Sequence, residues 1–216
     1  MLNLNQFDVE ILTSEDCPQG SEAWHAARAG RPTASEFSTV MAKGRSGGES
    51  KTRRTYLYKL AAERLTGEVV QTWGGNSHTE RGHEQEPEAR RLYSFMREAD
   101  PLQVGFVKRG PVGCSPDSMI GTDGLLEIKT RLPHLQLELL ETQELPSEHK
   151  AQCQGQLWVT DRKWLDYVSY CPKLPPFIIR VERDPIYIAE LAKATSVFLA
   201  ELDDLTARIA AMQEAA

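Results

Sequence analysis

A tight turn between two short apolar segments is the feature that most constrains this fold. Residues 118–120 and 125–129 have the composition of β-strands, and the Gly-Thr-Asp-Gly between them is typical of a hairpin turn. Side chains alternate across a strand, so Glu127 and Lys129 lie on the same face. The hairpin folds the strand that bears Glu127 back beside the segment that begins with Asp117. The sequence therefore predicts two carboxylates and a lysine grouped beside one hairpin.

This grouping indicates a divalent metal site. Two hard carboxylate ligands, from Asp117 and Glu127, suit Mg²⁺, with Mn²⁺ as an alternative. A cation held there would lower the pKa of a bound water and stabilise charge on a phosphodiester under attack. Lys129 would orient that water or neutralise the transition state. The competing interpretation is a solvated Glu/Lys pair on an exposed strand, which any sheet tolerates.

Two further segments favour the catalytic interpretation. Residues 152–156 read Gln-Cys-Gln-Gly-Gln on an expected helix, where Gln152 and Gln156 share a face. Amides donate to phosphate oxygens or hold a water without competing with the metal for charge. Glu86 adds a third acid near an expected helix start. A polar helix face and a surface glutamate are the alternative interpretations of these two segments.

Composition and cysteine usage are those of an ordinary globular domain. The chain has 216 residues, of which 40% are apolar and 26% charged, so we expect one domain over residues 1–216. Its four cysteines are scattered without a C-x-x-C pair, which indicates reduced thiols in the core rather than a zinc or disulfide site. The first residues lack a signal-peptide pattern, and no segment has the roughly 18 apolar residues of a membrane span. We expect a cytoplasmic protein with no membrane partner.

Charge is unevenly distributed along the chain. The formal net charge of −6 argues against a protein that coats DNA nonspecifically. Between Ala26 and Arg64, however, nine basic residues stand against three acidic ones, for a net of +6. From Asp184 onward six acidic residues outnumber two basic ones, for a net of −4. A polyanion is therefore expected to meet the N-terminal half.

Hydrophobic periodicity predicts an alternation of helices and strands. Helices are expected over residues 21–29, 34–42, 51–65, 77–99, 148–160 and 185–213, and strands over 104–107, 112–114, 118–120, 125–129, 164–170 and 177–181. The first four strand segments are interpreted as one antiparallel sheet, and Thr33 as a helix N-cap. Pro87 leaves two alternatives, a helix that kinks there or one that begins near Glu86. The apolar stripe of the last helix is expected to pack on the chain's own core, with a subunit contact as the alternative.

Two N-terminal segments point to a family resemblance. Residues 24–30 read Trp-His-Ala-Ala-Arg-Ala-Gly, and residues 33–36 read Thr-Ala-Ser-Glu. Together with the D…E-x-K, Q-x-Q and G-x-x-x-E-x-x-A patterns, they resemble the lambda exonuclease or YqaJ-type family of phage recombination exonucleases, from about Gly20 to Asp184. The resemblance implies an α+β (α/β) fold with a PD-(D/E)xK restriction-endonuclease-like core, in which helices flank a central mixed β-sheet. The N-terminal helices, about residues 20–64, would then hold a 5′-phosphate.

The resemblance also implies roles for individual residues. The 5′-phosphate would be bound by Arg28, Ser35, Ser115 and Gln152. The metal would be held by Asp117, Glu127, the Ile128 backbone carbonyl and the upstream acid Glu86. Catalysis would rest on Glu86, Asp117, Glu127, Lys129 and Gln152. A guanidinium fork, hydroxyls and a helix N-terminus are chemically suited to a phosphate, so the physical reasoning and the resemblance agree.

The implied activity is that of a Mg²⁺-dependent 5′→3′ exonuclease that digests linear, 5′-phosphorylated double-stranded DNA. It would leave 3′ single-stranded overhangs for a single-strand annealing protein, in the cytoplasm of a bacterium that carries the phage or prophage. The family forms homotrimeric rings around DNA, and enclosure would explain how an acidic protein handles a polyanion. The alternatives are a structure-specific or site-specific endonuclease of the same fold and a noncatalytic DNA-end-binding recombination accessory protein.

Overall fold

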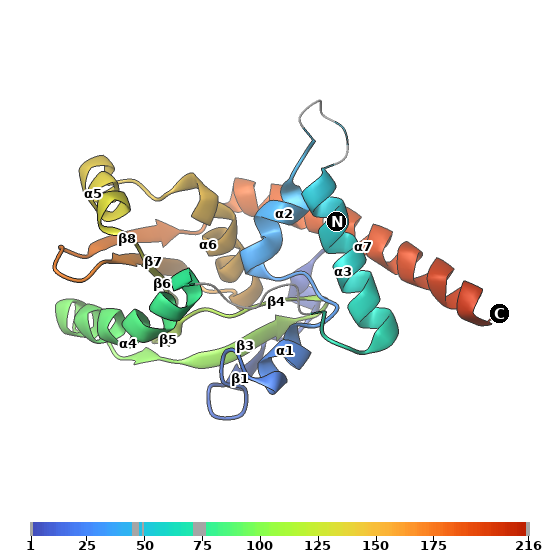
Figure 1. Cartoon of the computed structure of the whole chain (residues 1–216), viewed down its shortest axis with the longest axis horizontal. Helices are drawn as coiled ribbons and strands as arrows, with labels where there is room; N and C mark the ends of the chain where they lie inside the picture. The colour runs from blue at the N-terminus through green and yellow to red at the C-terminus, as the bar shows by residue number, and fades with distance from the viewer. Residues whose placement is uncertain (1, 45–47, 49, 71–76, 215–216) are drawn as a thin grey trace.

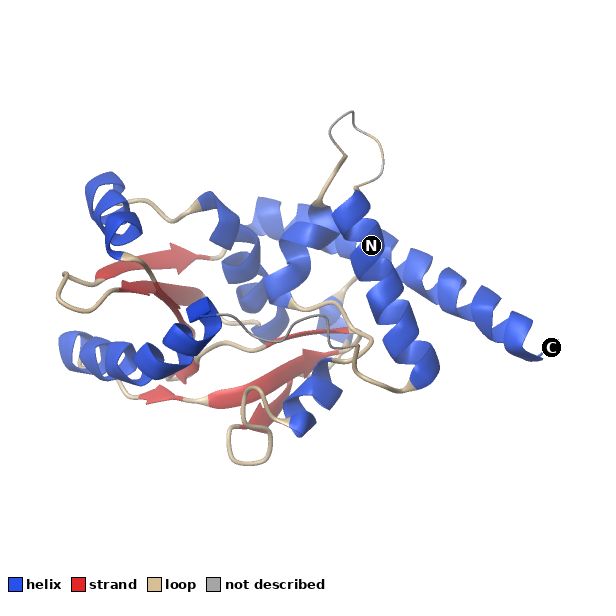
Figure 2. Ribbon diagram, in the orientation of Figure 1, coloured by secondary structure: helices blue, strands red, loops and turns tan. Residues whose placement is uncertain are grey.

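In the part of the chain that the structure describes, the strands form two β-sheets (Figure 1, Figure 2). The computed structural model describes residues 2–44, 48, 50–70 and 77–214, and for 77–80 and 83 it describes the helix but not the side chains. The smaller sheet has the order β1-β3-β4 and comprises β1 (Glu10–Thr13), β3 (Val104–Arg109) and β4 (Val112–Cys114). The larger sheet has the order β2-β5-β6-β7-β8 and comprises β2 (Pro101–Leu102), β5 (Ser118–Ile120), β6 (Gly124–Thr130), β7 (Trp164–Tyr170) and β8 (Phe177–Glu182).

The helices surround these sheets. In chain order they are the 3₁₀-helix η1 (Leu4–Gln6), α1 (Glu22–Arg28), the 3₁₀-helix η2 (Ala34–Glu36), α2 (Phe37–Met41), α3 (Lys51–Thr66), α4 (Ser77–Arg97), α5 (Pro133–Thr142), α6 (Ser147–Thr160) and α7 (Pro185–Glu214). Ser21 and Ser50 cap α1 and α3 by accepting from backbone amides three residues on. The helices expected over residues 21–29, 51–65 and 148–160 are confirmed, whereas η1, β1, β2 and α5 were not predicted.

The larger sheet is mixed and contains the predicted hairpin. β5 and β6 pair antiparallel, with Ser118 opposite Leu126. β6 and β7 pair parallel, with Glu127 opposite Tyr167, because α5 and α6 form the long crossover between them. The predicted fold class, a central mixed sheet flanked by helices, is confirmed.

The four strand segments between residues 104 and 129 do not form one antiparallel sheet, so this expectation was wrong. β3 and β4 pair with each other, and β3 also pairs with β1, whereas β5 and β6 join β7 and β8. Pairing with strands far away in the sequence outweighs the local order of the chain. The connection between β4 and β5 passes from one sheet to the other, and Ser115 and Asp117 lie in this connection.

Helices cover both faces of the larger sheet, which explains why Leu125 and Leu126, on opposite faces of β6, are both completely buried. α4 packs Ala89 and Tyr93 against Leu126 and Ile128. Leu125 belongs to the other face and joins the main core, to which α6 and α7 contribute. In Figure 1, α4 and α6 lie on opposite sides of the β6–β7 pair. Glu127 and Lys129 share the face of Leu125 and therefore point toward α6.

The structure corrects one local expectation and excludes one of the two alternatives at Pro87. Thr33 does not cap the following turn with its side chain, because its hydroxyl instead contacts Arg28 and Ser35. Pro87 lies inside α4, which begins at Ser77 rather than near Glu86. A proline in a helix interior costs about 3 kcal/mol. Packing of the following turns of α4 against the larger sheet offsets this cost.

The last helix packs on the core and then extends beyond it. Leu191, Phe198 and Leu202 are completely buried, whereas Met212 is 66% exposed. Figure 1 shows the C-terminal turns of α7 projecting from the rest of the molecule. The expected packing of this helix on the chain's own core is therefore confirmed as far as Leu202.

The cysteines and the helix compositions follow the sequence analysis. All four cysteines are buried and free, as expected for core thiols. Within the part of the chain that the structure describes, no helix is both long enough and apolar enough to cross a bilayer.

Candidate active site

One cavity of about 210 Å³ gathers most of the predicted site residues. It is lined by the predicted residues Arg28, Ser35, Ser115, Asp117, Glu127, Lys129 and Gln152, together with Gln19, Trp24, Ala34 and Gln156. These side chains come from the segment before α1, from α1, η2, the β4–β5 connection, β6 and α6. Of the predicted side chains, Glu86 does not line this cavity.

Glu127 is the centre of a hydrogen-bond network. Its side chain is 1% exposed, and Lys129 Nζ lies 2.5 Å from its Oε1. Gln152 Nε2 donates to the same oxygen at 2.5 Å, and Gln156 Nε2 donates to Oε2 at 2.6 Å. The four-residue spacing of the glutamines places both amides over one carboxylate. Glu127 is therefore held in a single orientation.

Asp117 lies one residue before β5. At this point the edge of β6 that faces β5 no longer pairs with a strand. The Ile128 amide donates to Asp117 Oδ2 at 2.5 Å instead of pairing with a neighbouring strand. The amide and the carbonyl of one residue point to the same edge of a strand, so the Ile128 carbonyl faces the side of Asp117. Burial, together with the negative charges of Glu127 and Glu86, raises the pKa of Asp117 well above its usual range. A bound cation would relieve this repulsion.

Lys129 is a fixed positive charge beside these carboxylates. Burial lowers the pKa of Lys129, but the charges of Glu127 and Asp117 outweigh burial and raise the pKa above its usual value. The ammonium group therefore stays protonated at neutral pH. It can donate to a phosphate oxygen or orient a water, but it cannot act as a general base at that pH.

Glu86 lines a neighbouring cavity of about 380 Å³. It forms an ion pair with Arg90, one turn further along α4. Arg90 in turn donates to Ser118 Oγ at 3.0 Å and to the Asp117 backbone oxygen at 3.4 Å. Gln19 lines both cavities. In this structure Glu86 therefore influences Asp117 through its charge and through Arg90.

A second cluster, which we call the cradle, consists of Trp24, Arg28, Thr33, Ser35 and Ser115. Trp24 Nε1 donates to Ser115 Oγ at 2.8 Å, and the Arg28 guanidinium lies 4.1 Å from the centre of the Trp24 ring. Arg28 Nη2 donates to Thr33 Oγ1 at 3.4 Å, and the hydroxyls of Thr33 and Ser35 are 3.3 Å apart. No described carboxylate forms an ion pair with Arg28, and burial lowers its pKa. A partly buried guanidinium flanked by hydroxyls is suited to an anion.

Close packing holds the cradle against α6. A Cβ at Gly155 would lie 2.3 Å from the Phe37 ring, so the absence of a side chain there lets α2 approach α6. The amide of Gly113 donates to the Pro32 carbonyl at 3.2 Å, which fixes the chain just before η2 to β4. The glycine within the Gln-rich helix is therefore explained by this close approach.

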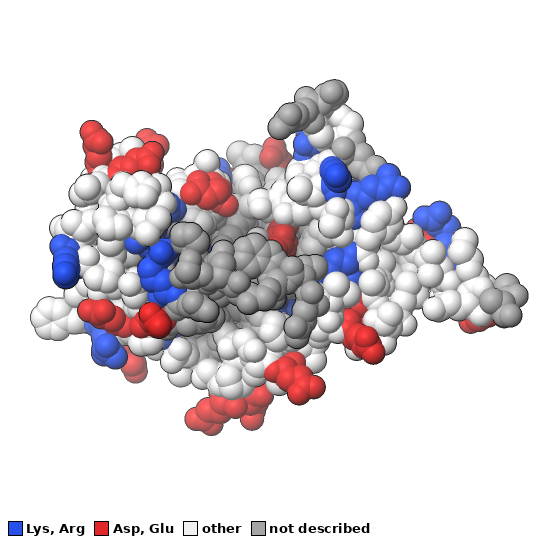
Figure 3. Space-filling model, viewed as in Figure 1, with Lys and Arg blue, Asp and Glu red and all other residues white. Residues whose placement is uncertain are grey.

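The fold neutralises part of the N-terminal basic stretch. Arg53 Nη1 lies 2.6 Å from Glu201 Oε2, and Arg64 Nη1 lies 2.6 Å from Asp203 Oδ1, so the acidic α7 pairs with α3. On the face seen in Figure 3, basic side chains gather over the beginning of α3 and acidic side chains over α5. Arg45, another member of the stretch, lies outside the described residues. The local surplus of positive charge is thus smaller than the sequence count indicates.

Sequence reasoning missed the roles of two cavity residues. Gln19 Nε2 donates to the carbonyls of Val104 at 3.3 Å and Pro116 at 3.2 Å, which ties the segment before α1 to the β4–β5 connection. No spacing marks Gln19, because these partners are 85 and 97 residues away. Trp24 was noted only as part of a motif. A partly buried indole N–H needs an acceptor, and this was the available signal for its bond to Ser115.

Comparison with known protein families shows the family to which this chain belongs. The model of the YqaJ-like viral recombinase domain matches residues 23–163, which is more than half of the chain. The chain belongs to the YqaJ-like viral recombinase family. The matched range contains the cradle, the β5–β6 hairpin and all of α6. The family resemblance predicted from the sequence is confirmed.

Solved structures agree with membership of the YqaJ-like family. The alkaline exonuclease LHK-Exo from Laribacter hongkongensis is 34% identical, with a TM-score of 0.81 over 90% of this chain and 98% of that one. LHK-Exo in complex with dAMP gives the same values. A phage related exonuclease from Haemophilus somnus 129PT, 14% identical with a TM-score of 0.62 over 83% of this chain and 96% of that one, shares the fold. None of the curated proteins compared matches this chain. The YqaJ-like family and the alkaline exonuclease support a DNA exonuclease role.

Proposed function

We propose that this chain is a Mg²⁺-dependent 5′→3′ exonuclease that digests linear double-stranded DNA from 5′-phosphorylated ends. It leaves a 3′ single-stranded overhang for a single-strand annealing protein, in the cytoplasm of a bacterium that carries the phage or prophage. Mn²⁺ is the alternative cofactor. The observation that carries the proposal is that one cavity of about 210 Å³ is lined both by cradle residues and by the carboxylates Asp117 and Glu127. Groups suited to grip a DNA end and groups suited to cleave it are therefore adjacent.

The donor set fits a divalent cation. Asp117 and Glu127 are hard oxygen donors, and their repulsion raises the pKa of Asp117. Among the described residues no three His, Cys, Asp or Glu side chains form a metal-holding group, so the Ile128 carbonyl and waters would complete the shell, as Mg²⁺ accepts. The ligand role of Glu86 stays a prediction, since Glu86 pairs with Arg90. Bound Mg²⁺ would supply an activated water and charge stabilisation at the phosphodiester.

The chain's own residues account for the other steps. The cradle binds the terminal 5′-phosphate, because its guanidinium and hydroxyl donors match phosphate oxygens. Lys129 stays protonated and neutralises charge that develops on the scissile phosphate. Gln152 and Gln156 keep Glu127 in one orientation, and Gln152 also lines the cavity in which the phosphate would bind. Each residue is thus positioned by the fold before DNA arrives.

A relative and the charge of the chain support two further parts of the proposal. The solved complex of LHK-Exo with dAMP shows that this relative binds a mononucleotide, which suits stepwise release of nucleotides here. We propose a homotrimeric ring, because enclosure of DNA replaces the overall positive charge that a protein of net charge −6 lacks. The basic side chains at the beginning of α3 then face the duplex (Figure 3).

Degradation of three DNA substrates tests the proposal. Linear duplex with a 5′-phosphate, linear duplex with a 5′-hydroxyl and covalently closed circles are each incubated with the protein in Mg²⁺ and in EDTA. We expect digestion of the phosphorylated linear duplex in Mg²⁺, with a 5′ label released before a 3′ label. Cutting of circles would favour an endonuclease of the same fold. Binding of ends without digestion would favour a noncatalytic accessory protein, and a monomer in light scattering would contradict the ring.

A further inference from the structure

A second cation follows Lys129 on the same face of the catalytic strand. Arg131 lies just beyond β6, and its amide still donates to the Tyr170 carbonyl of β7, at 2.8 Å. Strand spacing therefore continues, and Glu127, Lys129 and Arg131 share the face that α6 covers. The step of two residues, about 6.6 Å, is similar to the distance between successive phosphates in an extended nucleotide strand.

Arg131 is oriented by three partners. Its Nη2 donates to the Tyr167 hydroxyl at 3.2 Å and lies 3.0 Å from His149 Nε2 and 3.4 Å from Glu148 Oε1. Burial and the charges of Lys129 and Arg131 lower the pKa of His149 to about 4, so its ring is neutral at neutral pH and accepts from Arg131. Arg131 Nε is buried, and no described residue accepts a hydrogen bond from it. The guanidinium is therefore held in place with a donor still unused.

This guanidinium lines a cavity of about 250 Å³ that shares Lys129 with the catalytic cavity. Arg81 from α4 and His149 from α6 also line it. Among the described residues that line it, Glu148 is the one carboxylate, and its side chain is 61% exposed. These residues therefore bring together three permanent positive charges and one carboxylate that solvent reaches.

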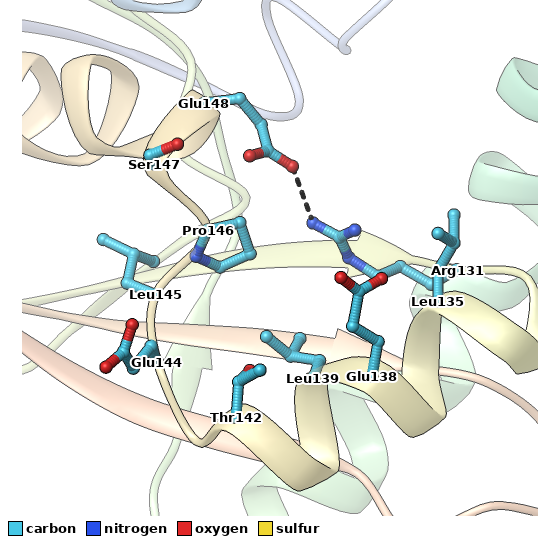
Figure 4. A pocket seen from close by; sticks show the side chains of 10 residues that line it. All are labelled: Arg131, Leu135, Glu138, Leu139, Thr142, Glu144, Leu145, Pro146, Ser147 and Glu148. Atoms are coloured by element: carbon cyan, nitrogen blue, oxygen red, sulfur yellow. Dashed lines mark hydrogen bonds and ion pairs between the residues drawn. The ribbon is translucent and has the colours of Figure 1, made fainter.

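A second cavity beside Arg131 is unsuited to a polyanion. Figure 4 shows Glu148, in the first turn of α6, paired with Arg131, and both residues line this cavity of about 360 Å³. Glu138 and Glu144 line that cavity, together with leucine side chains. A phosphate therefore approaches Arg131 from the side of Lys129.

Building on the proposed exonuclease function, we propose that Arg131 binds the phosphodiester immediately 3′ of the scissile one, in the strand being digested. The order of groups along the site argues for this position. The cradle takes the terminal 5′-phosphate, Lys129 stands at the scissile phosphate, and Arg131 is the next cation on the same face. Glu148, at 3.4 Å, occupies Arg131 when DNA is absent and is displaced by the phosphate.

Neutral phosphate analogues test this assignment. The probes are 5′-phosphorylated duplexes in which one uncharged methylphosphonate replaces the second linkage from the 5′ end, or the linkage paired with it in the complementary strand. Equilibrium binding is measured in EDTA, and first-nucleotide release is measured in Mg²⁺. For the wild-type chain we expect the second-linkage substitution to weaken binding about tenfold, as loss of a charge-assisted hydrogen bond would. The complementary-strand substitution should change little.

Variants then connect that penalty to Arg131. Arg131→Gln should bind the normal duplex about tenfold more weakly and show no further penalty with the methylphosphonate. Glu148→Gln should bind the normal duplex more tightly and the modified duplex as the wild type does. Arg208→Gln, an exposed arginine of α7 paired with Asp204, should behave as the wild type and is the matched control.

Several results would overturn the assignment. Equal losses for Arg131→Gln on both duplexes would mean that Arg131 supports the site without contacting that phosphate. A penalty from the complementary-strand probe alone would move the contact to the other strand. If Arg131→Gln has a lowered melting temperature, Glu148→Gln still tests the proposal, because that variant keeps Arg131. Unchanged binding of the normal duplex by Glu148→Gln would refute the displacement of Glu148 by a DNA phosphate. If binding changes as expected for every probe and variant but no DNA is digested in Mg²⁺, the proposed exonuclease function would be rejected. The contact between Arg131 and that phosphate would still stand.

Discussion

The two sides of the candidate site treat charge in opposite ways. One side, which we call the cleavage side, consists of Asp117, Glu127, Lys129, Gln152 and Gln156. There the Glu127 carboxylate accepts hydrogen bonds from both glutamine amides and pairs with the Lys129 ammonium. In the cradle, Arg28 has the face of Trp24 and one hydroxyl contact at 3.4 Å, with no ion pair to a described carboxylate. The buried charge of Glu127 is compensated within the protein, whereas the partly buried charge of Arg28 has no ion pair among the described residues.

This difference indicates what each side is built to do. A compensated carboxylate keeps its orientation, which suits a group that must act in the same way at every nucleotide. A desolvated guanidinium without a counter-ion keeps its affinity for an anion from outside, which suits recognition of a DNA end. The cleavage side should therefore be sensitive to geometry and the cradle to the charge of the substrate.

Removing one charge from the cleavage side should have the largest effect. Asp117→Asn should lower digestion by at least about a thousandfold, since it removes a ligand and a charge from the proposed metal site. Because burial and the charge of Glu127 already raise the pKa of Asp117, the melting temperature should stay the same or rise. Nuclease assays and thermal melting measure both. Asp123→Asn, in the hairpin turn, is the control and should digest DNA normally. Retained activity in Asp117→Asn would reject the site.

Removing the charge of the cradle should have a smaller effect that depends on the substrate. Arg28→Gln should slow digestion of 5′-phosphorylated ends about ten- to hundredfold, as expected for a charge-assisted hydrogen bond of about 1.5–3 kcal/mol. Digestion of 5′-hydroxyl ends should change little, because that end carries no charge for Arg28 to bind. Initial rates on the two substrates give the comparison. Equal losses on both ends would show that Arg28 supports the fold of the site rather than the phosphate.

Neighbouring glutamines of α6 allow a paired test of geometry. Gln156→Leu removes a donor to Glu127 and should raise the Mg²⁺ concentration for half-maximal rate about tenfold, since partners of metal ligands tune affinity by that order. Gln154 lies in the same helix but bonds the backbone of Glu182 and Asp184. Gln154→Leu should therefore cost about 1–3 kcal/mol of stability and leave the Mg²⁺ dependence unchanged. The same response from both variants would refute the distinction.

The sequence predicted the arrangement of the cleavage side better than that of the cradle, for a physical reason. Asp117, Glu127 and Lys129 belong to one hairpin, where the alternation of a strand decides which side chains meet. Gln152 and Gln156 follow from the spacing of one helix. Regular local geometry therefore predicted which side chains share a face, whereas the bonds from both glutamine amides to Glu127 were not predicted.

The remaining features depend on segments that are distant in sequence. β1 is short and mostly exposed, and it exists because Glu10 lies opposite Lys108 and its neighbours pair likewise with β3. Thr33 has the sequence of an N-cap, but the contact with Arg28 uses its hydroxyl. The place of Glu86 was also undecidable locally, because an arginine one turn along the helix competes with the proposed metal site for the Glu86 carboxylate. No periodicity ranks such partners.

The smallest expected effect concerns the stability of the folded protein at acidic pH. Beside the cleavage side, a proton added to His149 would place a positive charge next to Lys129 and Arg131. His149 accepts from Arg131, and its pKa is lowered to about 4 by burial and by the charges of Lys129 and Arg131. The folded state therefore resists its protonation, so stability is complete above the ordinary histidine pKa of about 6.5 and is lost as the pH falls from there toward 4. His149→Gln should lose less stability in that window, measured as melting temperature against pH, and the exposed His134→Gln should follow the wild type. Parallel curves for His149→Gln and the wild type would mean that protonation of His149 costs the fold nothing.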